Sequence, residues 1–312
     1  MVELEQISCK GITWINIEKP TREHITLLAQ RYPFHRLDLE DCLSKIQLSK
    51  VDEYENYLFI ILHFPILNES GMIQSSQVSI FLGEDYLITI HQGDLKPLVE
   101  FFQSCKNEEN RREKLINKGS AFLLYHIIDS LVDNIFPILD KLVGELNEVE
   151  DKVFDEKIEA VREVTLLRRK IADLRRITFP LRRVTKDLAT KVQRFSNQDI
   201  LNYFDDVNDH IEKVWDILEE CKETIEIYKD TDFMLSTEKT NKILAILTIV
   251  FTLSIPATVI AAFYGMNIPL PGGIETGPWT FLGPYTTLIV IIIMAAIPAL
   301  LMLIIFYRLG WI

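Results

Sequence analysis

Two long apolar runs near the C-terminal end of the 312-residue chain constrain its fold more than any other feature. Residues 243–263 and 285–307, 21 and 23 residues long, contain no Asp, Glu, Lys or Arg. At about 1.5 Å per helical residue, each run extends over roughly 30 Å, the thickness of the hydrocarbon core of a bilayer. We therefore expect two transmembrane helices.

The charges that flank these runs predict their orientation. Lys239 and Lys242 precede the first run, Arg308 follows the second, and the segment between them has neither Lys nor Arg. Because positive residues favour the cytoplasmic side, both termini should be cytoplasmic. The chain is then a multi-pass protein of the cell membrane (inner or plasma membrane), in contact with the lipid bilayer.

The charge balance excludes one class of partner. The formal net charge is −12, and beyond Lys242 the only charged residues are Glu275 and Arg308, so the acidic excess lies before the first apolar run. An acidic domain of this kind does not indicate nucleic-acid binding. It suits cations, or it keeps the domain soluble.

Catalytic and zinc-binding patterns are missing from the sequence. The four cysteines have no C-x-x-C spacing, and the six histidines form no H-x-x-x-H pair. There is no glycine-rich phosphate loop and no nucleophile elbow. We therefore expect a protein that is not an enzyme.

The N-terminal third of the chain alternates between strand and helix patterns. Residues 1–115 are predicted to form a cytosolic α/β domain with a mixed sheet. The segments that suggest this are a strand at 12–17, helices after Thr21 and over 34–43, an apolar run at 57–67, and a hairpin of 77–82 and 86–90.

Apolar residues at three- and four-residue spacing dominate the rest of the cytosolic part. We expect a helical hairpin over 116–196 and a stalk helix over 197–263 that continues without a break into the first transmembrane helix. An external loop over 264–284, a second transmembrane helix over 285–307 and a cytosolic tail over 308–312 complete the chain.

Several short motifs resemble landmarks of the CorA family of divalent-cation channels, in the order of that family. They are Leu39-Glu40-Asp41, Glu55-Asn56-Tyr57, Tyr203-Phe204-Asp205-Asp206-Val207, Thr240-Asn241 and Tyr264-Gly265-Met266-Asn267. The resemblance implies a funnel-shaped homopentamer that takes up Mg²⁺ passively, with Co²⁺ or Ni²⁺ as further ions. It also implies that the first apolar helix of each subunit lines the pore.

The Gly-Met-Asn signature is the candidate selectivity filter. Mg²⁺ binds oxygen octahedrally and loses its water reluctantly, so a ring of neutral oxygens could hold the hydrated ion and still release it. Gly265, Met266 and Asn267 end the first apolar run, and the Asn267 carboxamide and the Gly265 carbonyl would supply such oxygens.

One face of the first apolar helix is a candidate pore lining. Pro256 interrupts the run beside this face, so a kink or hinge is expected there. The alternative for such a stripe is ordinary helix packing through small and hydroxyl residues. The candidate lining and gate residues are Asn241, Leu244, Leu247, Thr248, Ile255 and Thr258.

The resemblance also implies a regulatory metal site between subunits. Asp41 of one subunit would meet Asp206 of the next, with Glu40 beside Asp41, and cytosolic Mg²⁺ would hold the two carboxylates together. Loss of this ion would release the domains and open a hydrophobic gate at Leu244 and Ile255.

The external loop departs from the family pattern. Many relatives carry an acidic loop after the signature, whereas this loop offers only Glu275. The sequence therefore does not decide which divalent ion is preferred, and a transporter of Zn²⁺ or another divalent ion is the main alternative. A membrane-tethered scaffold is a more distant alternative.

Overall fold

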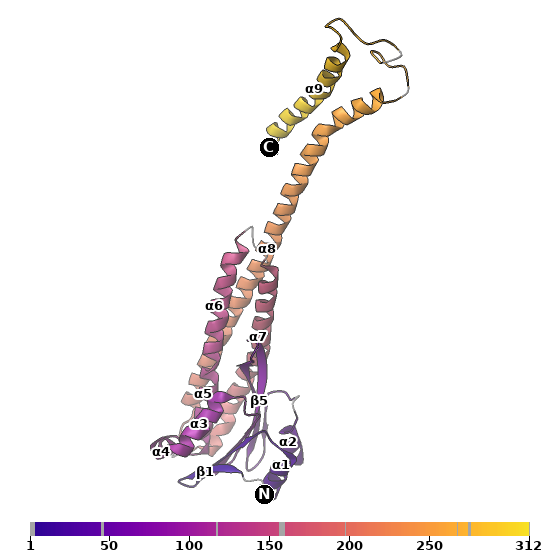
Figure 1. Cartoon of the computed structure of the whole chain (residues 1–312). Coiled ribbons are helices and arrows are strands. Elements are labelled where there is room, and N and C mark those ends of the chain that lie inside the picture. Colours follow the sequence, from indigo (N-terminus) through magenta and orange to yellow (C-terminus); the bar gives the residue numbers. More distant parts are fainter. Residues whose placement is uncertain are drawn as a thin grey trace. The chain divides into compact units, whose positions relative to one another are not determined.

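The structure is a computed structural model that describes residues 4–44, 47–116, 118–155, 160–196, 198–266, 268–273 and 276–311. Contacts divide the chain into two compact units, Met1–Asp232 and Phe233–Ile312, which are described in turn. Figure 1 shows the order of the elements along the chain.

The first unit contains a six-stranded mixed sheet. Its strand order is β1-β2-β6-β5-β4-β3, in which only the β2–β6 pair is parallel. The expected hairpin is confirmed, because β5 and β6 pair as antiparallel neighbours. The strands are β1 (Glu5–Cys9), β2 (Ile12–Glu18), β3 (Lys50–Glu53), β4 (Leu58–Leu67), β5 (Ile73–Leu82) and β6 (Tyr86–His91).

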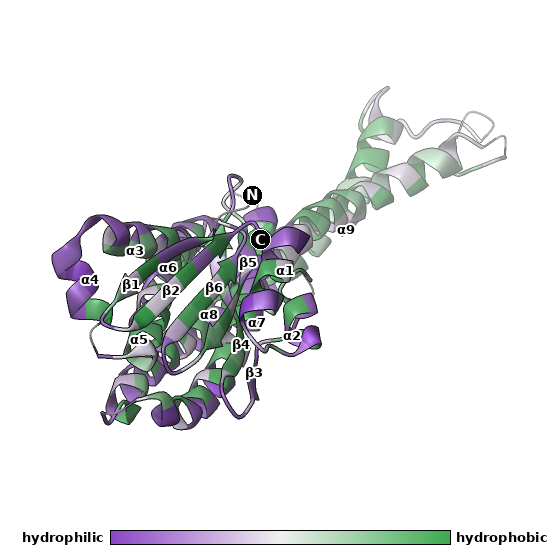
Figure 2. Cartoon of the chain, turned by 90° about the horizontal axis from the view of Figure 1, so that it is seen from below, coloured by the Kyte–Doolittle hydropathy of each residue, from purple (hydrophilic) through white to green (hydrophobic). Residues whose placement is uncertain are grey.

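Alternating apolar side chains give this sheet two buried faces. Phe59 and Ile61 of β4 pack against α1 (Arg22–Arg31) and α2 (Arg36–Asp41), whereas Ile60 and Leu62 face the larger core formed with the later helices. This follows from the two-residue period of a strand. Figure 2 shows the sheet between these two groups of helices.

The later helices of the first unit supply most of the larger core. Among them, α7 contacts β3, β4 and β5, so the long helices are part of the same compact unit as the sheet. They are α3 (Lys96–Asn107), α4 (Glu109–Ile116), α5 (Ser120–Asp133), α6 (Ile135–Val153), α7 (Val161–Val192) and the short 3₁₀ helix η1 (Gln193–Phe195).

A single continuous helix, α8 (Leu201–Tyr264), follows, as the sequence predicts. Its 64 residues correspond to about 96 Å of helix. In the first unit its apolar stripe, which includes Phe204, Val207 and Ile211, is buried. A buried hydrogen bond of 2.7 Å between Thr185 Oγ1 and Asn208 Oδ1 joins it to α7.

The second unit contains the C-terminal part of α8 and the apolar helix α9 (Thr286–Arg308). The most apolar 18-residue stretch of each of these two helices is not buried in the single chain. Figure 2 shows their predominantly hydrophobic residues. By length and composition the segment Ser120–Val153 could also cross a membrane. However, 61% of its most apolar 18-residue stretch is buried inside the protein. That segment packs as α5 and α6 of the core.

Candidate ion pathway and metal sites

The signature begins where α8 ends. Gly265 N–H still donates to Ala261 O at 2.9 Å, and Met266 N–H donates to Phe263 O at 3.1 Å. Gly265 does not have a positive φ. A Cβ added to it would lie 3.2 Å from Ala261 O, so the helix end is tight against this residue and favours glycine. Asn267, the main filter candidate, and Glu275 lie outside the described residues.

The loop after the signature is tied back to α8 and α9. Tyr264 donates its hydroxyl hydrogen bond to Pro271 O at 3.1 Å. Gly272 has a φ of +77°, and a Cβ there would lie 3.0 Å from the Trp279 ring. Trp279 N–H in turn donates to Thr287 Oγ1 at 2.9 Å. The first of these contacts joins Tyr264, at the end of α8, to the loop.

The candidate pore residues share one face of α8. On an ideal helix they fall within an arc of about 120°, and α8 remains helical on both sides of Pro256. Leu244, Leu247 and Ile255 are 55%, 47% and 53% exposed in the single chain, so their side chains are free to face an axis or a neighbouring subunit.

The Thr and Ser hydroxyls in the apolar part of α8 donate to the backbone of the same helix. Thr248 donates to Leu244 O at 2.8 Å, and Thr258 donates to Ser254 O at 2.9 Å. Such bonds to the preceding turn satisfy the donor without water or another helix. The hydroxyls therefore do not by themselves distinguish a pore-lining face from a packing face.

Asp41 ends α2 and is already paired. Its Oδ2 lies 2.9 Å from Lys50 Nζ, and its Oδ1 accepts a hydrogen bond of 2.9 Å from Gln47 Nε2. Lys50 also pairs with Asp52 at 2.6 Å. Burial works to lower the pKa of Lys50, but the hydrogen bonds and charges of Asp52 and Asp41 outweigh it and raise that pKa. In the single chain, both carboxylate oxygens of Asp41 therefore have a partner.

Glu40 and Asp206 are the other two predicted ligands of the cytosolic site. Glu40 forms an exposed pair of 2.8 Å with Arg36. Asp206 is exposed on α8, and its charge raises the pKa of Asp129 on α5.

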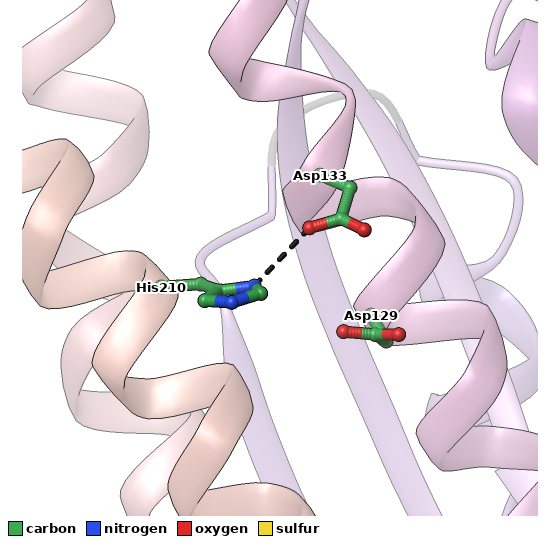
Figure 3. A group of neighbouring side chains, drawn as sticks. All are labelled: Asp129, Asp133 and His210. Atoms are coloured by element: carbon green, nitrogen blue, oxygen red, sulfur yellow. Dashed lines mark ion pairs between the residues drawn. The ribbon is translucent and has the colours of Figure 1, made fainter.

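A second group of possible metal ligands joins α5 to α8. Asp129, Asp133 and His210 each offer one ligand atom, and these atoms lie within 4.8 Å of one another (Figure 3). His210 Nδ1 is 3.1 Å from Asp133 Oδ1. Although this distance is that of an ion pair, the buried Nδ1 has no hydrogen-bond partner within the described part of the chain.

The electrostatics of this group favour a cation. Burial and the charge of Asp133 raise the pKa of Asp129, and Asp206 adds to this effect. Burial raises the pKa of the neighbouring Tyr125 to about 12, with Asp129 and Asp206 contributing. Neighbouring carboxylates that repel one another are stabilised by a bound cation. The two carboxylate oxygens suit Mg²⁺ or Mn²⁺, whereas the imidazole nitrogen suits Co²⁺, Ni²⁺ or Zn²⁺ better than Mg²⁺.

The sequence contains one pair of possible ligands on each of two helices, but neither pair alone indicates a metal site. Asp129 and Asp133 are four residues apart on α5, and Asp206 and His210 are four residues apart on α8. Each pair therefore lies on one face of its helix. Only the packing of α5 against α8 brings the two faces together.

The fold is that of a known magnesium transporter. The complete structure of the CorA magnesium transporter from Methanocaldococcus jannaschii superposes with a TM-score of 0.81 at 24% identity, covering 99% of this chain and 95% of that chain. The cytoplasmic domain of ZntB from Vibrio parahaemolyticus shares the fold more distantly, with a TM-score of 0.61 at 16% identity over 74% of this chain and 90% of that chain.

Sequence comparison defines the family. The family model described as CorA-like Mg²⁺ transporter protein matches residues 9–308. The cobalt/magnesium transport protein CorA of Thermotoga maritima is 31% identical over 262 residues, which are 82% of this chain and 73% of that protein. The protein of the same name from M. jannaschii is 27% identical over 316 residues, covering 99% and 95%. The chain belongs to the CorA-like Mg²⁺ transporter family, whose members are membrane transport proteins and not enzymes.

Proposed function

We propose that this chain is the subunit of a homopentameric channel that carries Mg²⁺ passively into the cell, and that Co²⁺ or Ni²⁺ can follow the same path. The observation that carries the proposal is the family match over residues 9–308, which includes both apolar helices and the signature. The names of the Thermotoga and Methanocaldococcus relatives support Mg²⁺ and Co²⁺ as transported ions.

The membrane topology of the proposal has two spans per subunit. The C-terminal part of α8 and α9 would cross the membrane, whereas Ser120–Val153 would not, because it is mostly buried in the core. Flanking Lys239, Lys242 and Arg308 favour cytoplasmic termini. Two helices of one subunit cannot enclose a hydrated path, so several copies of α8 must surround the axis.

The proposed filter is a ring of Gly265, Met266 and Asn267 from each subunit. Neutral oxygens of the Asn267 carboxamide and the Gly265 carbonyl would bind the water shell of Mg²⁺ without stripping it. The cytosolic half of the path would be closed by rings of Leu244, Leu247 and Ile255, because apolar rings in a narrow pore resist wetting.

Regulation would come from cytosolic Mg²⁺ between subunits. In the proposal, Asp41 of one subunit and Asp206 of the next share the ion, and Glu40 adds negative charge nearby. Asp129, Asp133 and His210 lie beside Asp206 along α5 and α8 and would hold a second ion. Because α8 is one continuous helix, movement of its cytosolic part would reach Leu244 and Ile255.

A transporter of Zn²⁺ is the second candidate. The imidazole of His210 favours it, because Zn²⁺ and Co²⁺ accept nitrogen ligands more readily than Mg²⁺ does. Uptake of Mg²⁺ in competition with Co²⁺, Ni²⁺ and Zn²⁺ separates the two candidates.

The decisive experiment is ion flux into proteoliposomes that contain only the purified protein. The parent should carry Mg²⁺ without ATP. In Asn267→Ala the rate should fall about tenfold or more while the oligomer stays intact, because the variant lacks the ring of hydrogen bonds to the water shell of the ion. Asn202→Ala, at an exposed position near the start of α8, is the matched control. Unchanged rate and selectivity in Asn267→Ala would refute the filter, and no flux of any divalent ion through folded parent protein would refute the channel.

A further inference from the structure

A cation of the protein itself already occupies the carboxylate of Asp41. Lys50 Nζ lies 2.9 Å from Asp41 Oδ2, and Gln47 Nε2 donates to Asp41 Oδ1 at 2.9 Å. Both oxygens of Asp41 therefore have a partner. A divalent ion that approaches Asp41 is repelled by the ammonium group of Lys50, and an ion that binds Oδ2 directly competes with Lys50 for that oxygen.

Lys50 has a second carboxylate within reach. Its Nζ is 2.6 Å from Asp52 Oδ2, so the ammonium group lies between Asp41 and Asp52. The side chains of Asp41 and Lys50 are only 21% and 34% exposed, which reduces screening of their interaction by water. Lys50 can therefore break its contact with Asp41 and still remain paired with Asp52.

The backbone beside Lys50 is held firmly. Lys50 is the first residue of β3, which pairs with β4. From the end of α7 and from η1, Lys191 Nζ donates to Val51 O at 3.4 Å, and Arg194 pairs with Glu53 at 2.9 Å. With the strand fixed, movement of Lys50 is limited to its side chain.

We infer that Lys50 is a tethered competitor that sets the affinity of Asp41 for a divalent ion: it neutralises Asp41 when no ion is bound, and it remains with Asp52 when an ion takes its place. This inference rests on the proposed regulatory role of Asp41. No proton is gained or lost, because only the partner of the ammonium group changes. The consequence is a regulatory site that fills at a higher Mg²⁺ concentration than two bare carboxylates would require.

The test measures how Mg²⁺ protects the full-length protein in detergent against proteinase K. Lys50→Met keeps the length of the side chain and removes the charge, so half-maximal protection should occur at an Mg²⁺ concentration lower by about tenfold, since one charge near a part-buried site has at least this effect at an effective dielectric constant of about 20. Lys106→Met is the control, because Lys106 is an exposed lysine of the same unit paired with Glu5 at 3.4 Å. It should leave the midpoint unchanged.

A second variant tests the opposite direction. Asp52→Asn removes the alternative partner and leaves Lys50 with Asp41 alone, so the midpoint should rise several-fold. If Lys50→Met does not fold, Asp52→Asn tests the inference by itself: an unchanged midpoint in this variant would contradict it. In Asp41→Asn protein, adding Lys50→Met should cause no further shift, because Lys50 acts through Asp41.

Two outcomes overturn the inference in distinguishable ways. If Lys50→Met has the midpoint of the parent while Asp41→Asn shifts it, Asp41 is a ligand and Lys50 does not compete. If Asp41→Asn also has the parent midpoint although Mg²⁺ flux is normal, Asp41 is not a regulatory ligand, and the inference fails while the proposed transport stands.

Discussion

The buried His91 should make the stability of the first unit depend on pH. His91 is 2% exposed at the end of β6. Its Nδ1 accepts a hydrogen bond of 3.0 Å from Gly93 N–H, so the ring proton lies on Nε2, which faces Asn16 Oδ1 at 3.1 Å. Thr89 Oγ1 donates to the same Asn16 oxygen at 2.7 Å. A second ring proton on Nδ1 would meet a donor and not an acceptor.

The magnitude follows from the pKa. Burial lowers the pKa of His91 from 6.5 to about 4, against a smaller opposite effect of Asp94. Because the folded-state pKa lies below the unfolded one, the unfolded state binds more protons between these values, and stability falls as the pH is lowered through this window. With 1.36 kcal/mol per pKa unit, the loss attributable to His91 between pH 7 and pH 4.5 is about 2.5 kcal/mol.

The assay compares His91→Gln with the parent protein. Urea unfolding of the full-length protein in detergent, followed by near-UV circular dichroism at pH 7 and pH 4.5, gives the free energy of unfolding at each pH. The variant lacks the titrating group, so it should lose about 2.5 kcal/mol less than the parent over this range. His35→Gln, at an exposed histidine, is the control. Equal losses in parent and His91→Gln would refute the reasoning, whatever the stability of the variant at pH 7.

Two further predictions concern the hydrophobic gate and the regulatory metal site between subunits. Ile255→Ser should raise leak of Mg²⁺ at high cytosolic Mg²⁺ by several-fold, because a hydroxyl eases wetting of the constriction, whereas Ile246→Ser, on the opposite face of α8, should not; equal leak in both variants would contradict the assigned face. Asp41→Asn combined with Asp206→Asn should weaken both protease protection by Mg²⁺ and inhibition of flux by Mg²⁺, and adding Asp129→Asn should weaken protection further. If protection of the parent and of the double variant against protease depends on Mg²⁺ concentration in the same way, Asp41 and Asp206 do not form the regulatory site.

Much of the fold could be predicted because it depends on local pattern. The alternation in residues 77–82 and 86–90 predicts a hairpin within a sheet, and β5 and β6 form it. The absence of Gly and Pro between residue 201 and Pro256 predicts one long helix, and α8 is continuous. Period and chain breakers act within a few residues, so they are visible without tertiary structure.

The candidate sites could be predicted only in part. The signature after α8 stands out because Gly265 follows directly on a long apolar helix. The pairing of Asp41 with Lys50 could not be foreseen, because nine positions and a change from helix to strand separate them. The same holds for His210 and Asp133, which come from helices far apart in the chain.

Composition by itself determined that two helices would be too apolar for water, because transfer of 21 or more uncharged residues into lipid needs no partner from elsewhere in the chain. Tertiary structure decided the outcome for Ser120–Val153, which also passes a length and hydropathy criterion for a span but is mostly covered by the rest of the first unit. It also decided which carboxylates are neutralised by lysine and which face one another across helices. Burial and charge pairing depend on neighbours in space, and the order of residues along the chain does not specify those neighbours directly.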